Sequence, residues 1–451
     1  MAVSVQPSAI LLRNGLLATF SEQDDLLSKP VARRVDVLIT GDRITAIAEP
    51  STVQSPPDTF VIDCTHKWIA PGFVDTHRLA PFTTTALTTA DDIYAGQLAG
   101  CLQALNGGTT TVLDHFHAAN SPAHIEKATQ ATVESGIRSM FCLSRGSWPT
   151  SLSPLRFDDD VEISKMQLEI LRTLAEKDNG RLCPDGRVTL GLAYDGQGRD
   201  PDEDKRILSL ARNLGVKPIT MHYVGGPHGA ATAYKVRKWA EAGLLQGDCV
   251  FSHGNGLVHP KPDLGEWELL KESGASIAST PVNELGMGHG NPIPYECIRR
   301  GVTVGLGIVS RIHENLSTKS KATAYNNCPA ASAFRLATLG GAEAAHVSSQ
   351  LGSIEVGKLA DFAIYDSESV NLAGCVDPFR GIVFHATGAD VEFVIVNGEI
   401  VKKGGILMRK DWKEVATQLK HRAGLLRERA AQYDLDQRYT AVMPILQLPV
   451  A

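Results

Sequence analysis

The chain reads Ala70-Pro71-Gly72-Phe73-Val74-Asp75-Thr76-His77 at the point where short hairpin-like strands give way to alternating strands and helices. Pro71-Gly72 is a turn signal, and the short apolar run after it predicts a buried strand. The run ends in His77, so a polar side chain stands at the carboxyl end of that strand. In parallel α/β barrels this end of the strands forms the active-site face. The stretch therefore predicts a barrel strand and a functional residue at its end.

Seven further apolar runs of this kind follow, and helix-length segments with helical periodicity separate them. Such alternation is typical of parallel βα units. Eight strands with crossover helices predict the α/β class and a closed (β/α)₈ barrel of the TIM type. The expected strands are Phe73–His77, Thr109–Asp114, Arg138–Leu143, Val188–Ala193, Pro218–His222, Cys249–His253, Ala275–Ser279 and Thr303–Gly307. The expected helices are Asp91–Asn106, Ala123–Ser135, Asp160–Lys177, Glu203–Leu214, Ala231–Ala242 and Leu264–Ser273.

Both ends of the chain have the texture of short strands and turns. The N-terminal runs are Ile10–Leu17, Val35–Ile39, Arg43–Ile47 and Phe60–Asp63, and strand-like texture returns in Leu351–Tyr365 and Val391–Ile406. The second of these contains Asn397-Gly398, a strong hairpin signal. We expect one small composite β-sandwich built from both ends. The expected division is residues 1–68 and 351–408 for this domain, 69–350 for the barrel, and 409–451 for a packing helix (Trp412–Tyr433) and tail.

The bulk composition narrows the class of partner. The 451 residues carry a formal charge of −6 and show no basic stripe, which gives nucleic-acid binding no support. No apolar run approaches membrane-spanning length, so we expect a cytoplasmic protein with a small-molecule partner and no membrane contact. Assembly into homo-oligomers stays open. The eight cysteines include no C-x-x-C pair, so we expect reduced, mostly buried thiols.

Three histidines end predicted strands, namely His77, His222 and His253. A neutral imidazole is a good zinc ligand, and catalytic zinc sites use about three protein ligands plus water. A lone histidine is more often a hydrogen-bonded structural residue. Three at equivalent strand ends favour a metal site.

Several segments together resemble the metal-dependent amidohydrolase superfamily, in particular its branch of cytosine-deaminase-like and triazine-hydrolase-like enzymes. Residues 70–77 resemble the first-strand signature, and Gly108-Thr109-Thr110-Thr111-Val112 resembles the second strand. Residues 337–342 are similar to the helix after the barrel, and residues 352–361 to the returning β domain. The resemblance covers nearly the whole chain.

The resemblance implies a hydrolase that acts on a carbon–nitrogen bond of a small molecule, such as deamination of a heterocycle, by metal-activated water. His77, His222 and His253 match the metal-ligand positions on the first, fifth and sixth strands. The implied cofactor is one divalent metal, with zinc preferred to iron or manganese. His253 and His289 are the expected catalytic residues.

Three positions depart from the family pattern. The second histidine of the first-strand pair is replaced by Leu79, and the eighth-strand aspartate by Val309. The position of the fifth-strand glutamate that shuttles protons is Gly225, and no obvious carboxylate is left for the proton work.

Both missing ligands adjoin short loops, because only eleven residues separate Leu79 from Asp91, and only about two dozen separate Ile308 from the predicted helix at Ser332. Relatives usually carry much longer segments there. Decay or repurposing of the site, and an exon-boundary error in the translation, are the two explanations.

Other polar residues follow the predicted strands. His115 and His117 come after the second strand and His289 after the seventh, and all three are expected substrate contacts. A metal-ligand role for His115 or His117 is the alternative, as is a packing role, and for His289 a solvated turn. His259, His313 and Glu314 lie in loops, where we expect solvated side chains.

Two functions therefore stay open. The first is the metal-dependent hydrolase. The second is a metal-free divergent homologue whose barrel binds a small molecule or catalyses a non-hydrolytic step, and Leu79, Val309 and Gly225 favour it.

Overall fold

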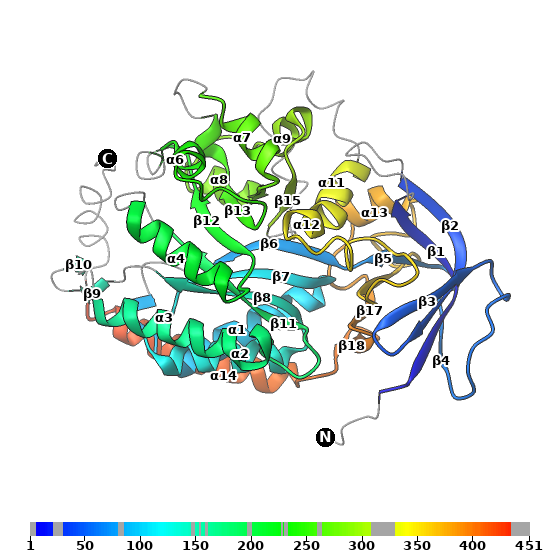
Figure 1. Ribbon diagram of the computed structural model, residues 1–451. Coiled ribbons are helices and arrows are strands. Elements are labelled where there is room, and N and C mark those ends of the chain that lie inside the picture. The colour runs from blue at the N-terminus through cyan, green and yellow to red at the C-terminus, as the bar shows by residue number, and fades with distance from the viewer. Residues whose placement is uncertain are drawn as a thin grey trace.

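Figure 1 shows the computed structural model of the chain, in which a barrel of strands and helices adjoins a separate sheet. The structure describes residues 6–20, 30–79, 85–145, 149–152, 155–157, 161–195, 201–226, 229, 233–258, 264–307 and 330–433.

Eight parallel strands form the barrel within the described chain, and their neighbours in the sheet follow the order of the sequence. All eight predicted strands are present, with ends that differ from the expected ones by no more than two residues. The expected α/β class and barrel are therefore confirmed. The strands are β6 (Phe73–Leu79), β7 (Thr109–Phe116), β8 (Arg138–Arg145), β11 (Val188–Tyr194), β12 (Ile219–Tyr223), β13 (Cys249–His253), β14 (Ser276–Ser279) and β15 (Val304–Leu306).

The first and last strands of this series lie side by side, so the barrel is nearly closed. A Cβ atom built on Gly307, just after β15, would lie 3.0 Å from the backbone nitrogen of His77 on β6. The interior is filled by side chains from different strands, among them Leu113, Cys142 and Val250. The carboxyl ends of the strands consequently meet at one mouth.

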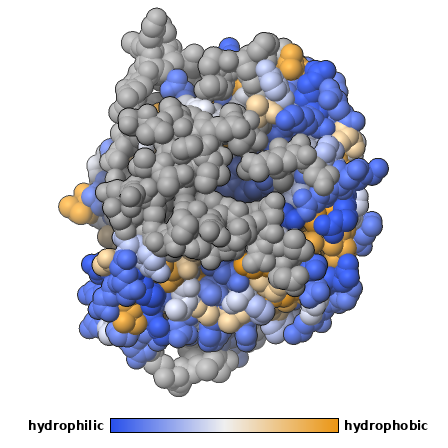
Figure 2. Space-filling model, turned by 90° about the vertical axis from the view of Figure 1, so that its left-hand side faces the viewer, coloured by the Kyte–Doolittle hydropathy of each residue, from blue (hydrophilic) through white to orange (hydrophobic). Residues whose placement is uncertain are grey.

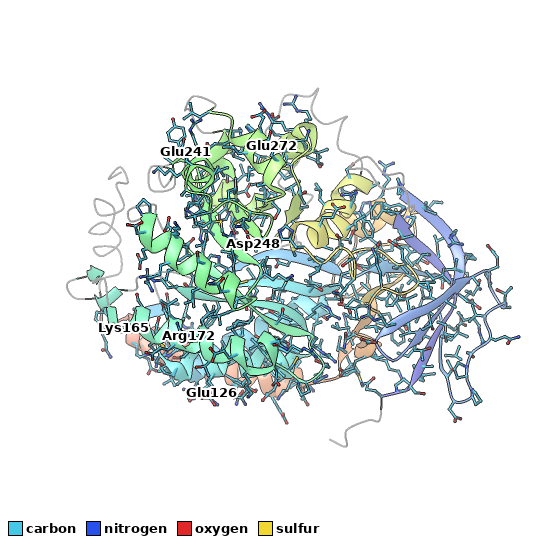
Figure 3. The ribbon with its side chains drawn as sticks, in the orientation of Figure 1. Glu126, Lys165, Arg172, Glu241, Asp248 and Glu272 are labelled. Carbon is cyan, nitrogen blue, oxygen red and sulfur yellow. The ribbon has the colours of Figure 1, made fainter. Side chains whose placement is uncertain are left out.

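Helices surround the barrel and turn their apolar sides to it. In α2, for example, Ile125 and Ala128 are buried while Glu126 is exposed. Figure 3 labels Glu126 and Arg172 on outer helices. The helices of the barrel are α1 (Ala90–Asn106), α2 (Pro122–Ser135), α3 (Val161–Glu176), α4 (Pro201–Asn213), α6 (Lys235–Glu241), α7 (Glu266–Ser273), α8 (Pro281–Gly286) and α9 (Pro294–Arg300). The short pieces η1 (Thr85–Leu87), η2 (Lys177–Gly180), η4 (Asn255–Leu257), β9 (Pro149–Leu152) and β10 (Leu155–Phe157) complete this part.

Both ends of the chain contribute to one mixed sheet, as expected for a composite β domain. It has nine strands within the described residues. The hairpin turn at Asn397-Gly398 is confirmed, with φ of 55° and 74°. The strands are β1 (Ala9–Phe20), β2 (Pro30–Thr40), β3 (Arg43–Ala48), β4 (Phe60–Asp63), β5 (Lys67–Pro71), β16 (Phe362–Asp366), β17 (Val391–Val396), β18 (Glu399–Lys403) and β19 (Ile406–Leu407).

A buried ion pair joins the barrel to this sheet. The Arg138 guanidinium, at the start of β8, donates from Nε to Asp361 Oδ2 at 2.9 Å and from Nη2 to Asp361 Oδ1 at 3.0 Å. The same Nη2 donates to the side chain of Asn397 in the hairpin turn at 2.8 Å.

Two expectations about the C-terminal region were wrong in detail. Residues 351–361 do not form a strand. Their backbone makes isolated hydrogen bonds to the region of the β2–β3 turn, such as the one from Ala360 N–H to Asp42 O at 2.9 Å. The helix expected to begin at Ser332 is two helices, α11 (Ala330–Ala337) and α12 (Leu339–Ala344), because Thr338 has a non-helical backbone. After α13 (Pro378–Phe384) and the last strands comes α14 (Trp412–Ala430), and its Arg422 pairs with Asp91 of α1 at 2.6 Å. The expected packing helix is therefore present.

The state of the cysteines and the character of the helices agree with the expectations from the composition. The seven cysteines among the described residues are free thiols, and six of them are buried. Within the described ranges, no helix combines the length and apolar character that crossing a membrane requires.

Candidate metal centre

Histidines from several strands converge at the mouth of the barrel. His77 lies on β6, His115 on β7, His222 on β12 and His253 at the end of β13. Neighbouring rings have centroids 5.0 Å apart for His77 and His222, and 5.1 Å apart for His77 and His253. The structure thus brings together the three histidines that the sequence predicted as metal ligands. Their ligand atoms all lie within 4.8 Å of one another.

Hydroxyl groups hold the outer side of two of these rings. Ser252 Oγ lies 2.9 Å from His77 Nδ1, and Thr280 Oγ1 lies 2.8 Å from His253 Nδ1. Within the part of the chain that the structure describes, His77 Nε2 is buried and has no hydrogen-bond partner. A buried polar atom left without a partner costs free energy, so it points to a ligand. Its placement fits a divalent metal, which imidazole nitrogen binds well.

Asp195 is a candidate site residue that the sequence did not reveal. It follows β11 directly, and its carboxylate lies 2.9 Å from His222 Nδ1. The same Oδ2 atom lies 3.3 Å from His115 Nε2 and 3.6 Å from His117 Nε2. The sequence offered no obvious carboxylate for the proton work, whereas the structure places this one beside the histidines. The signal was present, because Asp195 directly follows a predicted strand, but Asp195-Gly196 also has the form of an ordinary turn.

A second carboxylate supports His253 from behind. Glu284 of α8 is fully buried, and its Oε1 atom lies 3.8 Å from His253 Nδ1. Glu284 also accepts the Ser279 hydroxyl at 2.9 Å and the backbone N–H of Thr280. His253 itself has φ of 73°, a left-handed conformation that is uncommon for histidine and is often found at functional sites.

Burial favours the neutral form of three of these imidazoles, those of His77, His115 and His222. Burial, followed by the neighbouring histidines, holds the pKa of His77 well below its ordinary value. Burial and His117 lower the pKa of His115 to about 3. Burial also lowers the pKa of His222, although Asp195 opposes the shift. Burial would raise the pKa of Asp195, but His222 and His115 outweigh it, and that pKa lies well below the usual range. Neutral imidazoles beside an ionised carboxylate are a donor set suited to a divalent cation.

The packing of the loop after β12 explains why position 225 is a glycine. A Cβ atom at this position would lie 2.4 Å from the carbonyl oxygen of His289 and 2.9 Å from that of Asn255. The position of the expected glutamate is thus closed to any side chain. The same close approach places His289, which is 4% exposed, beside His253, with ring centroids 4.9 Å apart.

The remaining sequence predictions fall partly beyond the described residues. His259, Val309, His313 and Glu314 lie outside them. Leu79 ends β6, and the register of the sheet pairs it with His115 on β7. The position expected to hold the second histidine of the pair is therefore opposite a histidine on the next strand.

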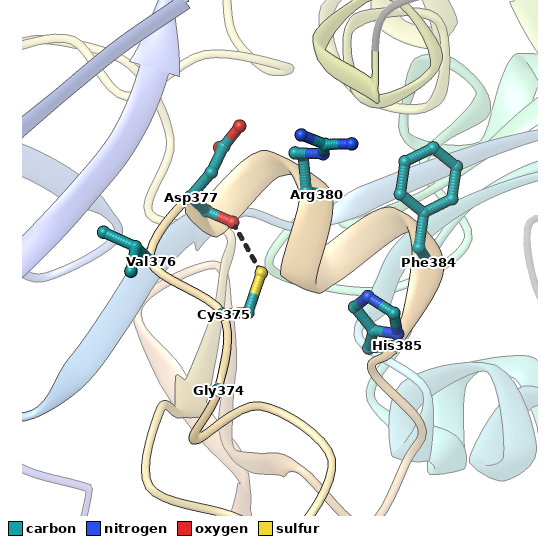
Figure 4. Close-up of a pocket in the computed structure, with 7 residues that line it drawn as sticks. All are labelled: Gly374, Cys375, Val376, Asp377, Arg380, Phe384 and His385. Carbon is teal, nitrogen blue, oxygen red and sulfur yellow. Dashed lines mark hydrogen bonds between the residues drawn. The ribbon is translucent and has the colours of Figure 1, made fainter.

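A separate cavity of about 610 Å³ lies on α13 and shares no residue with the histidine cluster. Figure 4 shows its lining, in which the Cys375 thiol donates to the carbonyl of Asp377 at 3.3 Å. Figure 2 shows one face of the molecule, where hydrophilic residues cover most of the described surface and apolar residues form small separate patches. The convergent polar groups of a catalytic site belong to the barrel mouth and not to this cavity.

A parallel barrel with histidines and a carboxylate at the strand ends defines a class of metal-dependent barrel hydrolases. Comparison with known proteins agrees, because the profile of the amidohydrolase family matches residues 68–401. The chain belongs to the amidohydrolase family.

Curated relatives extend over nearly the whole chain. The chain is 24% identical to 5-methylthioadenosine/S-adenosylhomocysteine deaminase of Thermoanaerobacter pseudethanolicus, over 93% of this chain and 100% of that protein. It is 26% identical to 5'-deoxyadenosine deaminase of Methanobrevibacter smithii, over 84% and 91% of the two chains.

Solved structures show the same fold. Atrazine chlorohydrolase TrzN from Arthrobacter aurescens TC1, complexed with zinc, is similar with a TM-score of 0.75 and 21% identity, over 92% of this chain and 99% of that one. An adenosine deaminase from Xanthomonas campestris with bound zinc is similar with a TM-score of 0.76 and 17% identity, over 94% and 99%.

Proposed function

We propose that this protein is a metal-dependent hydrolase that removes the amino group from the ring of a small heterocycle, with adenosine-type nucleosides as the substrate class. The observation behind the proposal is the convergence of His77, His222 and His253 at the barrel mouth. The named relatives support the substrate class, since they are deaminases of adenosine derivatives.

In this proposal the three imidazoles hold one divalent metal, zinc in the first instance and iron or manganese otherwise. The metal supplies the Lewis-acid activation of water that hydrolysis at neutral pH requires. Water adds at the ring carbon that bears the amino group, the carbon–nitrogen bond breaks, and ammonia leaves.

The side chains behind the rings do the positioning. If His77 held the metal through Nε2, its Nδ1 would carry the hydrogen and donate to Ser252, which would fix the tautomer and the ring angle. Thr280 and Glu284 hold His253 in the same way. His289, next to His253, is the group we assign to proton exchange with the substrate.

The test is deamination by the metal-loaded protein. Adenosine, 5'-deoxyadenosine and 5'-methylthioadenosine are incubated with zinc-, iron- and manganese-loaded protein, and ammonia release is measured together with the ultraviolet change of the purine ring. His77→Ala and His253→Ala should each lower turnover by roughly a hundredfold or more, as expected for lost ligands of the reacting centre. His421→Ala, an exposed position on α14, is the matched control and should retain full activity.

The same test distinguishes the hydrolase from the alternative function. Wild-type protein that folds stably but neither retains metal nor releases ammonia from any of these nucleosides would exclude the hydrolase and favour the metal-free homologue.

A further inference from the structure

His115, His117 and Asp195 come together although their strands are not neighbours. The two histidines stand at the end of β7, Asp195 follows β11, and β8 lies between these strands in the sheet. The Asp195 Oδ2 atom faces three ring nitrogens at once, at 3.3 Å from His115, 3.6 Å from His117 and 2.9 Å from His222. The ligand atoms of these four residues all lie within 4.8 Å of one another.

These separations match the spacing of ligands around one metal ion. Zinc binds nitrogen and carboxylate oxygen at about 2.0–2.1 Å in tetrahedral sites, which places neighbouring ligand atoms about 3.3 Å apart. The three distances from Asp195 Oδ2 bracket that value. Each residue stands at a strand end, and the rings of His115 and His117 stack with centroids 4.3 Å apart.

His115 supplies an independent reason to expect a ligand here. Its side chain has no exposed surface, the Asp195 carboxylate lies 3.3 Å from its Nε2, and its Nδ1 has no hydrogen-bond partner among the described residues. A buried polar group without a partner costs about 1–3 kcal/mol. A ligand bound by this imidazole would remove that cost.

We propose that His115, His117, Asp195 and His222 form a second divalent-cation site, which binds an ion independently of His77 and His253. Three imidazole nitrogens and one carboxylate favour zinc, cobalt or iron over magnesium or calcium. His222 belongs to both sets of candidate ligands. In this assignment His115 and His117 are metal ligands and not substrate contacts.

The competing explanation is a network without metal. Lys235 of α6 is buried, and its ammonium donates to the carbonyl of His222 at 3.5 Å. In that explanation Asp195 balances Lys235 through space and hydrogen-bonds to His222, and no ion is needed.

Cobalt binding separates the two explanations without any measurement of turnover. The double variant His77→Gln/His253→Gln removes two ligands of the first set and leaves all four residues of the second. We expect it to retain one Co²⁺ per chain after gel filtration, with the visible absorption of a four-coordinate ion. Adding Asp195→Asn or His117→Gln to this background should weaken cobalt binding by roughly tenfold or more. Adding His421→Gln should leave it unchanged, and excess Mg²⁺ or Ca²⁺ should not displace the ion.

Two results would overturn the proposal: no cobalt retained by the folded double variant, or undiminished cobalt retained after the Asp195 and His117 changes. Circular dichroism and thermal melting establish that each variant is folded. If the double variant does not fold, the same comparison is made in the wild-type chain, where His117→Gln must remove one bound ion. Failure of the proposed deamination is seen separately, as absent ammonia release from wild-type protein with its metal content measured.

Discussion

The Asp195 carboxylate forms hydrogen bonds with both the backbone and the ring of His222. Oδ1 accepts the backbone N–H of His222 at 2.8 Å, and both carboxylate oxygens lie within 3.0 Å of His222 Nδ1. Asp195 follows β11, and His222 lies one residue before the end of the neighbouring strand β12. Asp195 therefore orients the one histidine that belongs to both groups of candidate ligands.

The charge of Asp195 can be removed with little change of shape. Asp195→Asn keeps an oxygen for the backbone N–H of His222 but loses the negative charge. We expect turnover and metal retention to fall by roughly 10–100-fold, as for other groups that orient a metal ligand. Ammonia release and metal content measure the two effects. Glu126→Gln, an equivalent change at an exposed position of α2, should alter neither, and an Asp195→Asn protein with full activity and metal content would contradict the assignment.

Gly225 should not tolerate a side chain. Gly225→Ala places a Cβ atom 2.4 Å from the His289 carbonyl oxygen, so the backbone must move. We expect a loss of roughly 1–3 kcal/mol in the free energy of unfolding, measured with urea. The control is Gly96→Ala in α1, where a Cβ meets nothing within 4 Å. That change should be neutral or stabilise the protein by about 0.5–1 kcal/mol. Equal effects at the two glycines would show that the close approach is not real.

The ion pair between Arg138 and Asp361 should be essential to the junction of the barrel with the sheet. Arg138→Met leaves the buried Asp361 carboxylate without its partner, at a cost of roughly 3–5 kcal/mol in unfolding free energy. Arg299→Met breaks an exposed pair with Glu296 and should cost less than about 1 kcal/mol. The double variant Arg138→Met/Asp361→Leu should recover much of the loss, because no buried charge remains unpaired.

Lys402 should make stability depend on pH in the alkaline range. Its side chain has no exposed surface and donates to the carbonyls of Asn106 and Gly388, and burial lowers its pKa from 10.5 to about 8. Between these two pH values the unfolded chain binds more protons at this residue than the folded chain does. Its contribution to the free energy of unfolding therefore rises from pH 8 to pH 10.5, by about 3 kcal/mol at most.

The comparison with Lys402→Met isolates this contribution from that of other groups. The difference in unfolding free energy, wild type minus variant, should increase across the alkaline window, as measured by urea unfolding at several pH values. A difference that stays flat would show that the lysine titrates normally.

The barrel could be predicted because each of its strands is recognisable from the residues of that strand alone. A run such as Cys249–His253 is apolar, short and bounded by polar residues, and it forms the strand β13 with the same ends. Residues 351–361 were not predictable in this way, because their backbone bonds go to the distant turn at Asp42 and not to a regular neighbour. The break at Thr338 was likewise not predicted, because threonine is not itself a helix-breaking residue, yet its backbone is non-helical in the structure, with φ of −121° and ψ of −91°.

The candidate site likewise has one part that the sequence predicted and one part that only the tertiary structure revealed. The sequence alone placed His77, His222 and His253 at or within two residues of strand ends, because each of them closes a short apolar run. Only the tertiary structure decided that Asp195 joins them, since nothing local distinguishes an aspartate in a turn from one aimed into a barrel mouth. The curvature of the closed sheet brings the ends of β7 and β11 together across β8, and this convergence turns His115, His117 and Asp195 into one group.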